Sequence, residues 1–435
     1  MLSRLETYFG FASHQTTWRT EVLAGLTTFI TMAYIIFVNP AILSQTGMPL
    51  AAVTTSTCLC AAIGSILMGT LANYPLALAP GMGLNAYFTY TVVKGMGIPW
   101  QTALGAVFLS GIIFLLLTFG GIRQKLLGAV PHQLHAAVAG GIGLFIAFIG
   151  LRNSGIIVPS TATTVTLGNL HMHSTQLTIF GIVLIAVLQA YRVKASMLIG
   201  VLATLAAGIL LHQVRYMPST FNPMAIRDTA LHLDIRGALH LNAFEIIFVF
   251  LFVDLFDNIG TLVAVTERAG LIAPDHTIPR LDKIFFADAA STVVGSLAGT
   301  STVTSYIESS AGVAAGGRTG VTAIVTGVLF FLSIFVAPVV GAIPDFATAP
   351  ALILVGALML GGLGSIEWDE PRFAIPAFLT IITIPLTYSI ATGLSFGLIS
   401  YAALELLTGR GRRQHWMLYL LAVLFLLRFV YVSQG

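Results

Sequence analysis

The chain has 435 residues, of which 57% are hydrophobic and only 9% are charged, and its formal net charge is +3. Soluble domains carry about 25% charged residues, so this composition excludes an ordinary soluble domain and indicates an integral membrane protein. The small positive charge also argues against a nucleic-acid partner, since it reflects loop residues rather than a basic face.

Apolar stretches long enough to cross a bilayer recur along the whole chain. No cleavable apolar core or signal site precedes the first one, so we expect it to remain as the first span. A hydropathy window predicts about 14 spans. In chain order they lie at 22–44, 51–72, 75–93, 101–119, 131–151, 176–191, 196–212, 243–265, 283–298, 303–315, 319–341, 349–364, 373–389 and 391–408. A last apolar stretch at 416–432 is either a further span or an interfacial helix.

Positive charge predicts the orientation of these spans. With the N-terminus inside, the Lys and Arg residues on the outer side are only Lys94, Arg152, Arg215, Arg227 and Arg236. Apart from Arg428 in the last apolar stretch, all the others fall inside, as the positive-inside rule requires. We therefore expect a cytoplasmic N-terminus, in a protein of the bacterial cytoplasmic (inner) membrane.

Two segments far apart in the chain share a weak pattern. The sequence GSILMGTLA at 64–72 resembles ASTVVGSLA at 290–298, and each precedes a break that ends in an aromatic residue. Two copies of a seven-helix unit fit this spacing, and an odd number of spans per copy inverts the second copy in the membrane. We predict a first repeat at 1–212, an inverted repeat at 243–408 and a C-terminal apolar segment at 409–435. Chance similarity among Gly-rich helices is the alternative, which the paired breaks disfavour.

The two breaks are the best indication of a binding site. Residues 78–85 (LAPGMGLN) cannot form a continuous helix, because proline removes a donor and glycines weaken the helical hydrogen bonds. Residues 300–305 (TSTVTS) are rich in β-branched and hydroxyl side chains. We expect both segments to begin as extended backbone and to continue as half-helices. Irregular backbone at membrane depth is tolerated only where it is buried or lines a wet cavity.

Acidic side chains within apolar spans are the candidate functional groups, because a carboxylate at membrane depth is costly. Asp254 and Asp257 share one helical face, and two such carboxylates disfavour each other's charge, which suits one of them to proton exchange. Either could instead pin a broken helix through hydrogen bonds. Glu308 follows the second break directly and is the strongest ligand candidate, because a carboxylate accepts two hydrogen bonds from a flat donor edge. Asp288 is expected to join the broken helices structurally or to take part in proton coupling.

Asn85 is the counterpart of Glu308 in the first break and offers both a donor and an acceptor. Its side chain could instead serve only to form hydrogen bonds with backbone groups that the break leaves without helical partners. Three aromatic residues near these positions, Tyr87, Phe256 and Tyr306, could stack on a planar ligand, as could Phe29 in the first predicted span. His132 and His135 are interpreted as surface residues rather than as metal ligands.

Other chemistry is not indicated by the sequence. The glycine-rich run at 312–320 lacks the Gly-Lys-Ser/Thr ending of a phosphate-binding loop. No nucleophile and base, metal cluster or nucleotide-binding domain is evident, so we expect neither an enzyme nor a cofactor. Transport driven by an ion gradient fits these features.

Three motifs then carry a resemblance to a known family. The segments GMGLNAYF at 81–88, DLFDNIGTL at 254–262 and TSTVTSYIESS at 300–310, the last continuing to GGRTG at 316–320, resemble those of the AzgA-like purine permeases. These permeases belong to the nucleobase/ascorbate transporter (nucleobase:cation symporter-2) family. The resemblance covers nearly the whole chain.

The resemblance implies an all-α polytopic fold of about 14 spans in two inverted repeats, divided into a core and a gate domain with helices from both. It implies a homodimer that imports purine bases by proton symport, through an elevator-type movement of core against gate. Its first, third, eighth and tenth spans enclose the base. By the family pattern Asn85, Asp254 and Glu308 lie at the base and Asp257 lies beside it. Taken together, the candidate binding residues are Thr28, Asn85, Tyr87, Asp254, Phe256, Tyr306 and Glu308, and the candidate proton-coupling residues are Asp254, Asp257, Asp288 and Glu308.

Adenine-selective bacterial members resemble Asn-Leu-Phe-Asp where this chain has Asp254 to Asp257, which favours guanine and hypoxanthine here. A 6-oxopurine presents N1–H as a donor whereas adenine presents an acceptor there, so an extra carboxylate suits the former. The alternatives are a broad purine or adenine permease and, of a different class, an anion exchanger or channel on the sulfate-permease-like plan. An anion carrier would not place acidic side chains at its substrate.

Overall fold

The computed structural model describes residues 2–119, 130–214, 222, 224–273, 278–340, 343–411 and 416–432. The described chain is mostly helical, as expected for the fold class. Eight helical segments are long and apolar enough to cross a membrane by length and composition, and four shorter apolar helices accompany them within the described residues. The protein is therefore an integral membrane protein.

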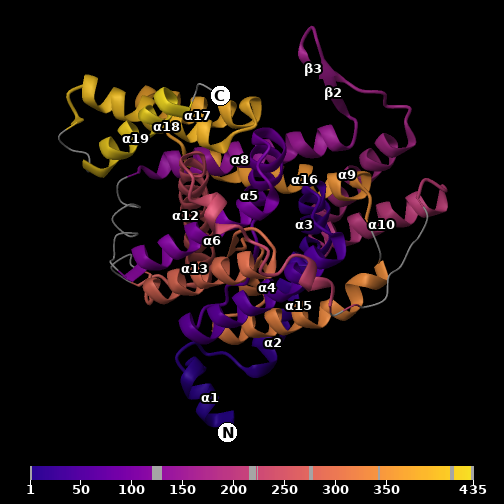
Figure 1. Cartoon of the computed structure of the whole chain (residues 1–435). Helices are drawn as coiled ribbons and strands as arrows, with labels where there is room; N and C mark the ends of the chain where they lie inside the picture. The colour runs from indigo at the N-terminus through magenta and orange to yellow at the C-terminus, as the bar shows by residue number, and fades with distance from the viewer. Residues whose placement is uncertain are drawn as a thin grey trace.

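The first half of the chain forms seven segments after a short N-terminal helix, α1 (Leu2–Phe9). They are α2–α3 (Trp18–Met32, Ile35–Leu43) with the turn η1 (Ser44–Thr46), α4 (Leu50–Leu67) continued by the wide-turn helix η2 (Met68–Ala72), β1–α5–η3 (Leu78–Pro80, Met82–Ala86, Tyr87–Gly95), α6 (Trp100–Phe119), α8 (His132–Asn153), α9 (His173–Ala190) and α10 (Ser196–Leu210). An antiparallel hairpin, β2 (Ile157–Ser160) and β3 (Thr164–Leu167), joins α8 to α9 and projects from the molecule in Figure 1.

The second half repeats this order after two short elements, η4 (Ala225–Asp228) and α11 (Ile235–Ala238). Its segments are α12 (Leu241–Ala269), α13 (Leu281–Ala298), β4–α14 (Val303–Ser305, Ser309–Ala314), α15 (Gly320–Val340), α16 (Asp345–Met359) with η5 (Leu360–Ser365), α17 (Pro371–Thr387) and α18 (Ile390–Leu407). Both halves thus place a strand and a half-helix in their third segment, and the fold is that of two inverted seven-helix repeats. The apolar stretch at 416–432 is helix α19 (Trp416–Val432), which packs on α18.

The predicted breaks are confirmed, and their strands pair with each other. Strand β1 runs antiparallel to β4, with Leu78 opposite Ser305 and Pro80 opposite Val303. Gly81 extends the pairing through its N–H, which donates to Thr302 O over 2.9 Å. A Cβ at Gly81 would lie 2.6 Å from Thr304 Cγ2, so the close approach of the two breaks requires glycine here.

A hydroxyl group anchors the first residue of each strand in the same way. Ser65 on α4 accepts from Leu78 N and donates to Leu78 O, at 3.0 and 3.1 Å. Thr292 on α13 likewise accepts from Val303 N and donates to Val303 O, at 3.3 and 3.0 Å. Backbone polar groups at membrane depth must be satisfied within the protein. In both halves a hydroxyl on the preceding helix satisfies the N–H and the carbonyl of the first strand residue.

The first predicted span, 22–44, is interrupted, which the sequence did not indicate. The chain leaves α2 at Ala33, and α3 begins at Ile35. Around this point the backbone bonds tighten from the i−4 to the i−3 pattern, with Ile36 N donating to Ala33 O and Phe37 N to Tyr34 O. The break places Tyr34 at the bend.

The helices pack in two groups, each drawn from both halves of the chain. In one group α15 packs on α2 and α4, and α13 packs on α4 and α6. In the other, α16 packs on α8 and α9, and α17 packs on α8 and α18. Helix α12 contacts both α14 and α8 and so lies between the groups. Figure 1 shows the orange α15 beside the indigo α2, away from the yellow α17 and α18.

Some of the Lys and Arg residues from which the orientation of the spans was predicted lie outside the described residues. These are Arg123, Lys125, Arg215, Arg412 and Arg413. The cytoplasmic location of the N-terminus and the boundaries of the two repeats stay predictions.

Candidate functional site

The β1–β4 crossing is the centre of the candidate site. Every residue of both strands is buried. Beyond the strand pairing, Tyr306 N donates to Ala77 O over 3.0 Å, and the Tyr306 hydroxyl donates to Pro80 O over 2.5 Å. Tyr306 therefore binds the two breaks together through its hydroxyl, a role that the sequence did not suggest for this candidate stacking residue.

Glu308 lies just beyond the crossing and is held by the broken first span. The Tyr34 hydroxyl donates to Glu308 Oε1 over 2.6 Å. Tyr34 is 1% exposed, whereas Glu308 keeps part of its surface accessible. The carboxylate is thus anchored on one side by a buried donor, in a residue that is itself only partly buried.

Asn85 occupies the matching position in the first break. It is fully buried, and the Ser301 hydroxyl donates to its Oδ1. Within the described part of the chain its Nδ2 has no hydrogen-bond partner. Leaving a buried donor unpaired costs about 1–3 kcal/mol, so this amide is available to a ligand or a water molecule.

The structure brings several predicted acids near one another. Asp257 has charge interactions with both Asp288 and Glu308, and Tyr306 interacts with Glu308 and Asp257. Asp288 is fully buried, and Asp254 is 3% exposed on α12, one turn before Asp257. The candidate groups for proton exchange and for ligand binding therefore lie near one another.

Thr28 lines the contact between α2 and α14. It is fully buried, and its Oγ1 has no hydrogen-bond partner among the described residues. A Cβ on Gly312 would collide with Thr28 Oγ1 and would lie 2.7 Å from Ala24 O. Glycine at 312 therefore lets the half-helix that follows Glu308 pack closely on α2.

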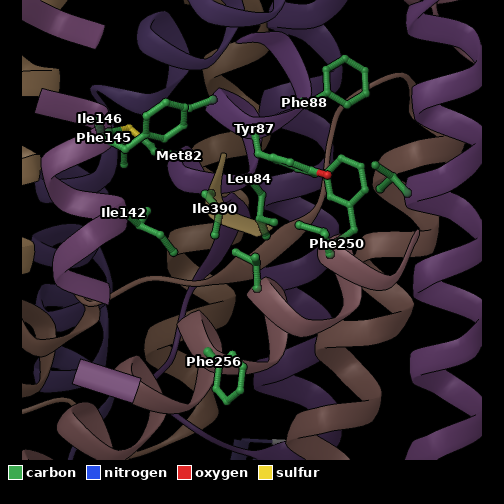
Figure 2. Close-up of a cluster of buried hydrophobic side chains, with 14 of the residues drawn as sticks. Met82, Leu84, Tyr87, Phe88, Ile142, Phe145, Ile146, Phe250, Phe256 and Ile390 are labelled. Carbon is green, nitrogen blue, oxygen red and sulfur yellow. The ribbon is translucent and has the colours of Figure 1, made fainter. Parts of the chain in front are cut away.

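Two of the other predicted aromatic residues lie in apolar surroundings. The Tyr87 ring meets Phe250 edge-on with centroids 5.2 Å apart, in the cluster that Figure 2 shows between α5, α8 and α12. Phe256 lies apart from that pair in the same view and packs on His135, with centroids 4.9 Å apart. His132 is exposed as predicted, but His135 is partly buried, and the surface interpretation was wrong for it.

Four further residues were missed by the sequence. Tyr34 and Ser301 hold the two candidate ligand groups. Asn258 is fully buried one turn after Asp254, and neither of its amide atoms has a hydrogen-bond partner within the described ranges. Its place in the 254–262 motif was the available signal. Glu21 is fully buried in α2, although it lies just before the first predicted span at 22–44.

Hydrogen bonds to Glu21 show the structural role of the glycine-rich run at 312–320. Its carboxylate accepts from Arg318 N at 3.0 Å and Thr319 N at 3.3 Å. It also accepts from the hydroxyls of Thr322 at 2.5 Å and Thr16 at 2.9 Å. The run is therefore the connection from α14 to α15, fixed to α2. In the described chain no group of three or more His, Cys, Asp or Glu residues is placed to hold a metal ion.

Comparison with known proteins identifies the family. A model of the Permease family matches residues 19–396. The chain belongs to the nucleobase/ascorbate transporter family. Its function is therefore that of a permease rather than an enzyme.

Three curated relatives match along nearly their whole length. A putative permease of Methanocaldococcus jannaschii is 53% identical, with 99% of each chain covered. Adenine permease AdeP of Escherichia coli is 44% identical over 99% of this chain and 96% of the relative. Guanine/hypoxanthine permease PbuG of Bacillus subtilis is 46% identical over 99% of this chain and 100% of the relative.

A solved structure supports the fold. The transmembrane domain of the cyanobacterial bicarbonate transporter BicA aligns with a TM-score of 0.67, covering 88% of this chain and 98% of that one. The sequences are only 14% identical, so the likeness concerns the architecture of inverted repeats and not the substrate.

Proposed function

We propose that the protein is a secondary active transporter that imports purine nucleobases, with guanine and hypoxanthine favoured, by proton symport. The observation that carries the proposal is the Glu308 carboxylate, anchored by Tyr34 beside the crossing of the two broken helices. A carboxylate accepts from N–H groups on the edge of a base. The free Nδ2 of Asn85 would donate to a ring nitrogen or carbonyl.

Sequence identity does not decide which purine is preferred, because this chain is 44% identical to an adenine permease and 46% identical to a guanine/hypoxanthine permease. The preference is therefore argued from individual side chains. Asp254 favours the 6-oxopurines, because it adds an acceptor for N1–H and for the amine of guanine. A broad purine or adenine permease is the alternative. Thr28, Tyr306, Phe256 and Tyr87 remain candidates for further contacts with the base.

Proton coupling would use the acids around Glu308. Asp257 interacts electrostatically with Asp288 and Glu308, and Asp254 lies one turn away on the same helix. Moving a bare carboxylate through the membrane costs several kcal/mol. A proton taken up by Asp254, Asp257, Asp288 or Glu308 would remove much of that cost before the loaded carrier moves.

The transport movement would displace one packing group against the other. The group around α2, α4, α13 and α15 would be the core, and the group around α8, α16, α17 and α18 would be the gate. Two separately packed groups of helices, each drawn from both halves of the chain, suit an elevator-type displacement. We further propose a homodimer in the bacterial inner membrane with a cytoplasmic N-terminus.

Anion transport is disfavoured for this chain, although the similar solved structure is that of a bicarbonate transporter. An anion beside Glu308 and Asp257 would meet carboxylates, and like charges at close range in a low dielectric repel strongly. The relatives that match nearly the full chain at 44–46% identity are named as nucleobase permeases.

Uptake of labelled bases tests the proposal. Hypoxanthine, guanine, adenine, xanthine and uracil would be supplied to cells that lack endogenous carriers and express this chain. We expect uptake of hypoxanthine and guanine, lost in the Glu308→Gln variant. Uptake of none of these bases by a well-expressed protein, together with bicarbonate or sulfate transport in vesicles, would replace the proposal with the anion alternative.

A further inference from the structure

The two candidate ligand groups share an arrangement that crosses the repeats. Glu308 belongs to the second half and is held by Tyr34 from the first. Asn85 belongs to the first half and is held by Ser301 from the second. Each ligand group is therefore oriented by a hydroxyl from the opposite repeat.

We propose that Tyr34 and Ser301 are positioning residues of the nucleobase site, which orient the Glu308 carboxylate and the Asn85 amide without touching the base. The inference rests on the proposed function. It adds the requirement that the ligand groups be oriented before the base binds.

The Tyr34 contact has the geometry of a strong hydrogen bond. A separation of 2.6 Å between a hydroxyl and a carboxylate oxygen is short, as charge-assisted bonds are. Tyr34 is held at the α2–α3 break by backbone bonds from Phe37 N and Val38 N to its carbonyl, at 3.1 and 3.0 Å. A ring fixed in this way orients the carboxylate and leaves its remaining acceptor positions for the base.

The Ser301 contact determines which end of the Asn85 amide faces a ligand. Ser301 is fully buried and donates to Oδ1, so Nδ2 remains as the donor without a partner in the described residues. Without that hydroxyl the amide could rotate and exchange its donor for its acceptor. Loss of Ser301 should therefore weaken binding through a wrongly oriented amide.

Single substitutions with matched controls test both contacts. Affinity for hypoxanthine would be measured on the full-length protein in nanodiscs, and KM and kcat in proteoliposomes. Tyr34→Phe should weaken binding about tenfold, equivalent to about 1.4 kcal/mol, and should raise KM more than it lowers kcat. The control Tyr74→Phe removes a buried hydroxyl that donates to Pro279 O over 2.8 Å and should change affinity less than twofold, an order-of-magnitude expectation for a remote bond.

For the second contact, Ser301→Ala should weaken hypoxanthine binding by about threefold to tenfold, as expected for loss of a neutral hydrogen bond. Ser296→Ala is its control, because it removes a buried hydroxyl that donates to Val293 O over 2.8 Å and should leave affinity unchanged.

Double variants separate positioning from a general structural role. If Tyr34 acts through Glu308, adding Tyr34→Phe to Glu308→Asp, which keeps a carboxylate but withdraws it from the Tyr34 hydroxyl, should cause little further loss, because coupled residues are not additive. Ser301→Ala should likewise add little to Asn85→Ala. Losses of affinity that multiply in the double variants would overturn the inference, and so would a Tyr34→Phe protein that binds like the wild type. In either case, purine binding by the wild-type protein would leave the proposed function intact. A folded wild-type protein that binds no purine would refute the proposed function and this inference together.

Discussion

Replacement of Glu21 tests the packing that fixes the α14–α15 connection next to Glu308. The side chain is fully buried and accepts from two backbone N–H groups and two threonine hydroxyls. In Glu21→Ala the hydroxyls can turn to other acceptors, but the N–H groups of Arg318 and Thr319 cannot. The buried Thr319 N–H left unpaired predicts a loss of about 1–3 kcal/mol in the free energy of unfolding, and the part-buried Arg318 N–H adds a smaller loss.

Glu21→Gln should cost less than Glu21→Ala, because the amide keeps one acceptor oxygen. The assay is unfolding of the purified protein in mild detergent, followed by denaturant titration and by thermal loss of the monodisperse peak. Glu6→Gln is the matched control, since Glu6 accepts a single bond from Trp18 Nε1 at 2.9 Å, which an amide oxygen can also accept. A Glu21→Ala protein as stable as the wild type would refute the assignment of Glu21 as the anchor of this connection.

Three predictions concern transport. Glu308→Gln should abolish high-affinity purine binding, because one acceptor becomes a donor and leaves buried groups unpaired at about 1–3 kcal/mol or more; unchanged affinity by calorimetry would remove Glu308 from the site. Hypoxanthine uptake should fall as external pH rises and collapse with a protonophore, and uptake that follows sodium instead would refute proton coupling. Asp254→Asn should shift selectivity toward adenine, because the amide can donate to adenine N1 but pairs less well with N1–H. Competition of labelled hypoxanthine and adenine by unlabelled bases measures that shift, and equal loss of all purines in a folded variant would assign Asp254 to the proton path instead.

The amino-acid sequence by itself determined the class, most of the spans and the two breaks. Hydrophobicity is a local property, so a window about 20 residues long identifies a membrane helix without knowledge of its neighbours. The break at 78–85 was equally local, since Pro80 removes a backbone donor and the glycines beside it weaken the helical hydrogen bonds. The four acids of the candidate site were found because a charged side chain in an apolar span is costly wherever it points.

Only the tertiary structure decided how the candidate groups are held. Tyr34 and Glu308 are 274 residues apart, and Ser301 and Asn85 are 216 apart. Aromatic residues make up 10% of the chain, so being aromatic did not single out Tyr34. Nothing near Tyr34 in the sequence predicted the break in the first span. These contacts join opposite repeats, and their partners meet only because β1 and β4 pair at the centre of the fold. Hydropathy and helix-breaking residues act over one or two turns of chain, whereas the orientation of a buried carboxylate depends on whichever distant side chain the packing brings to it.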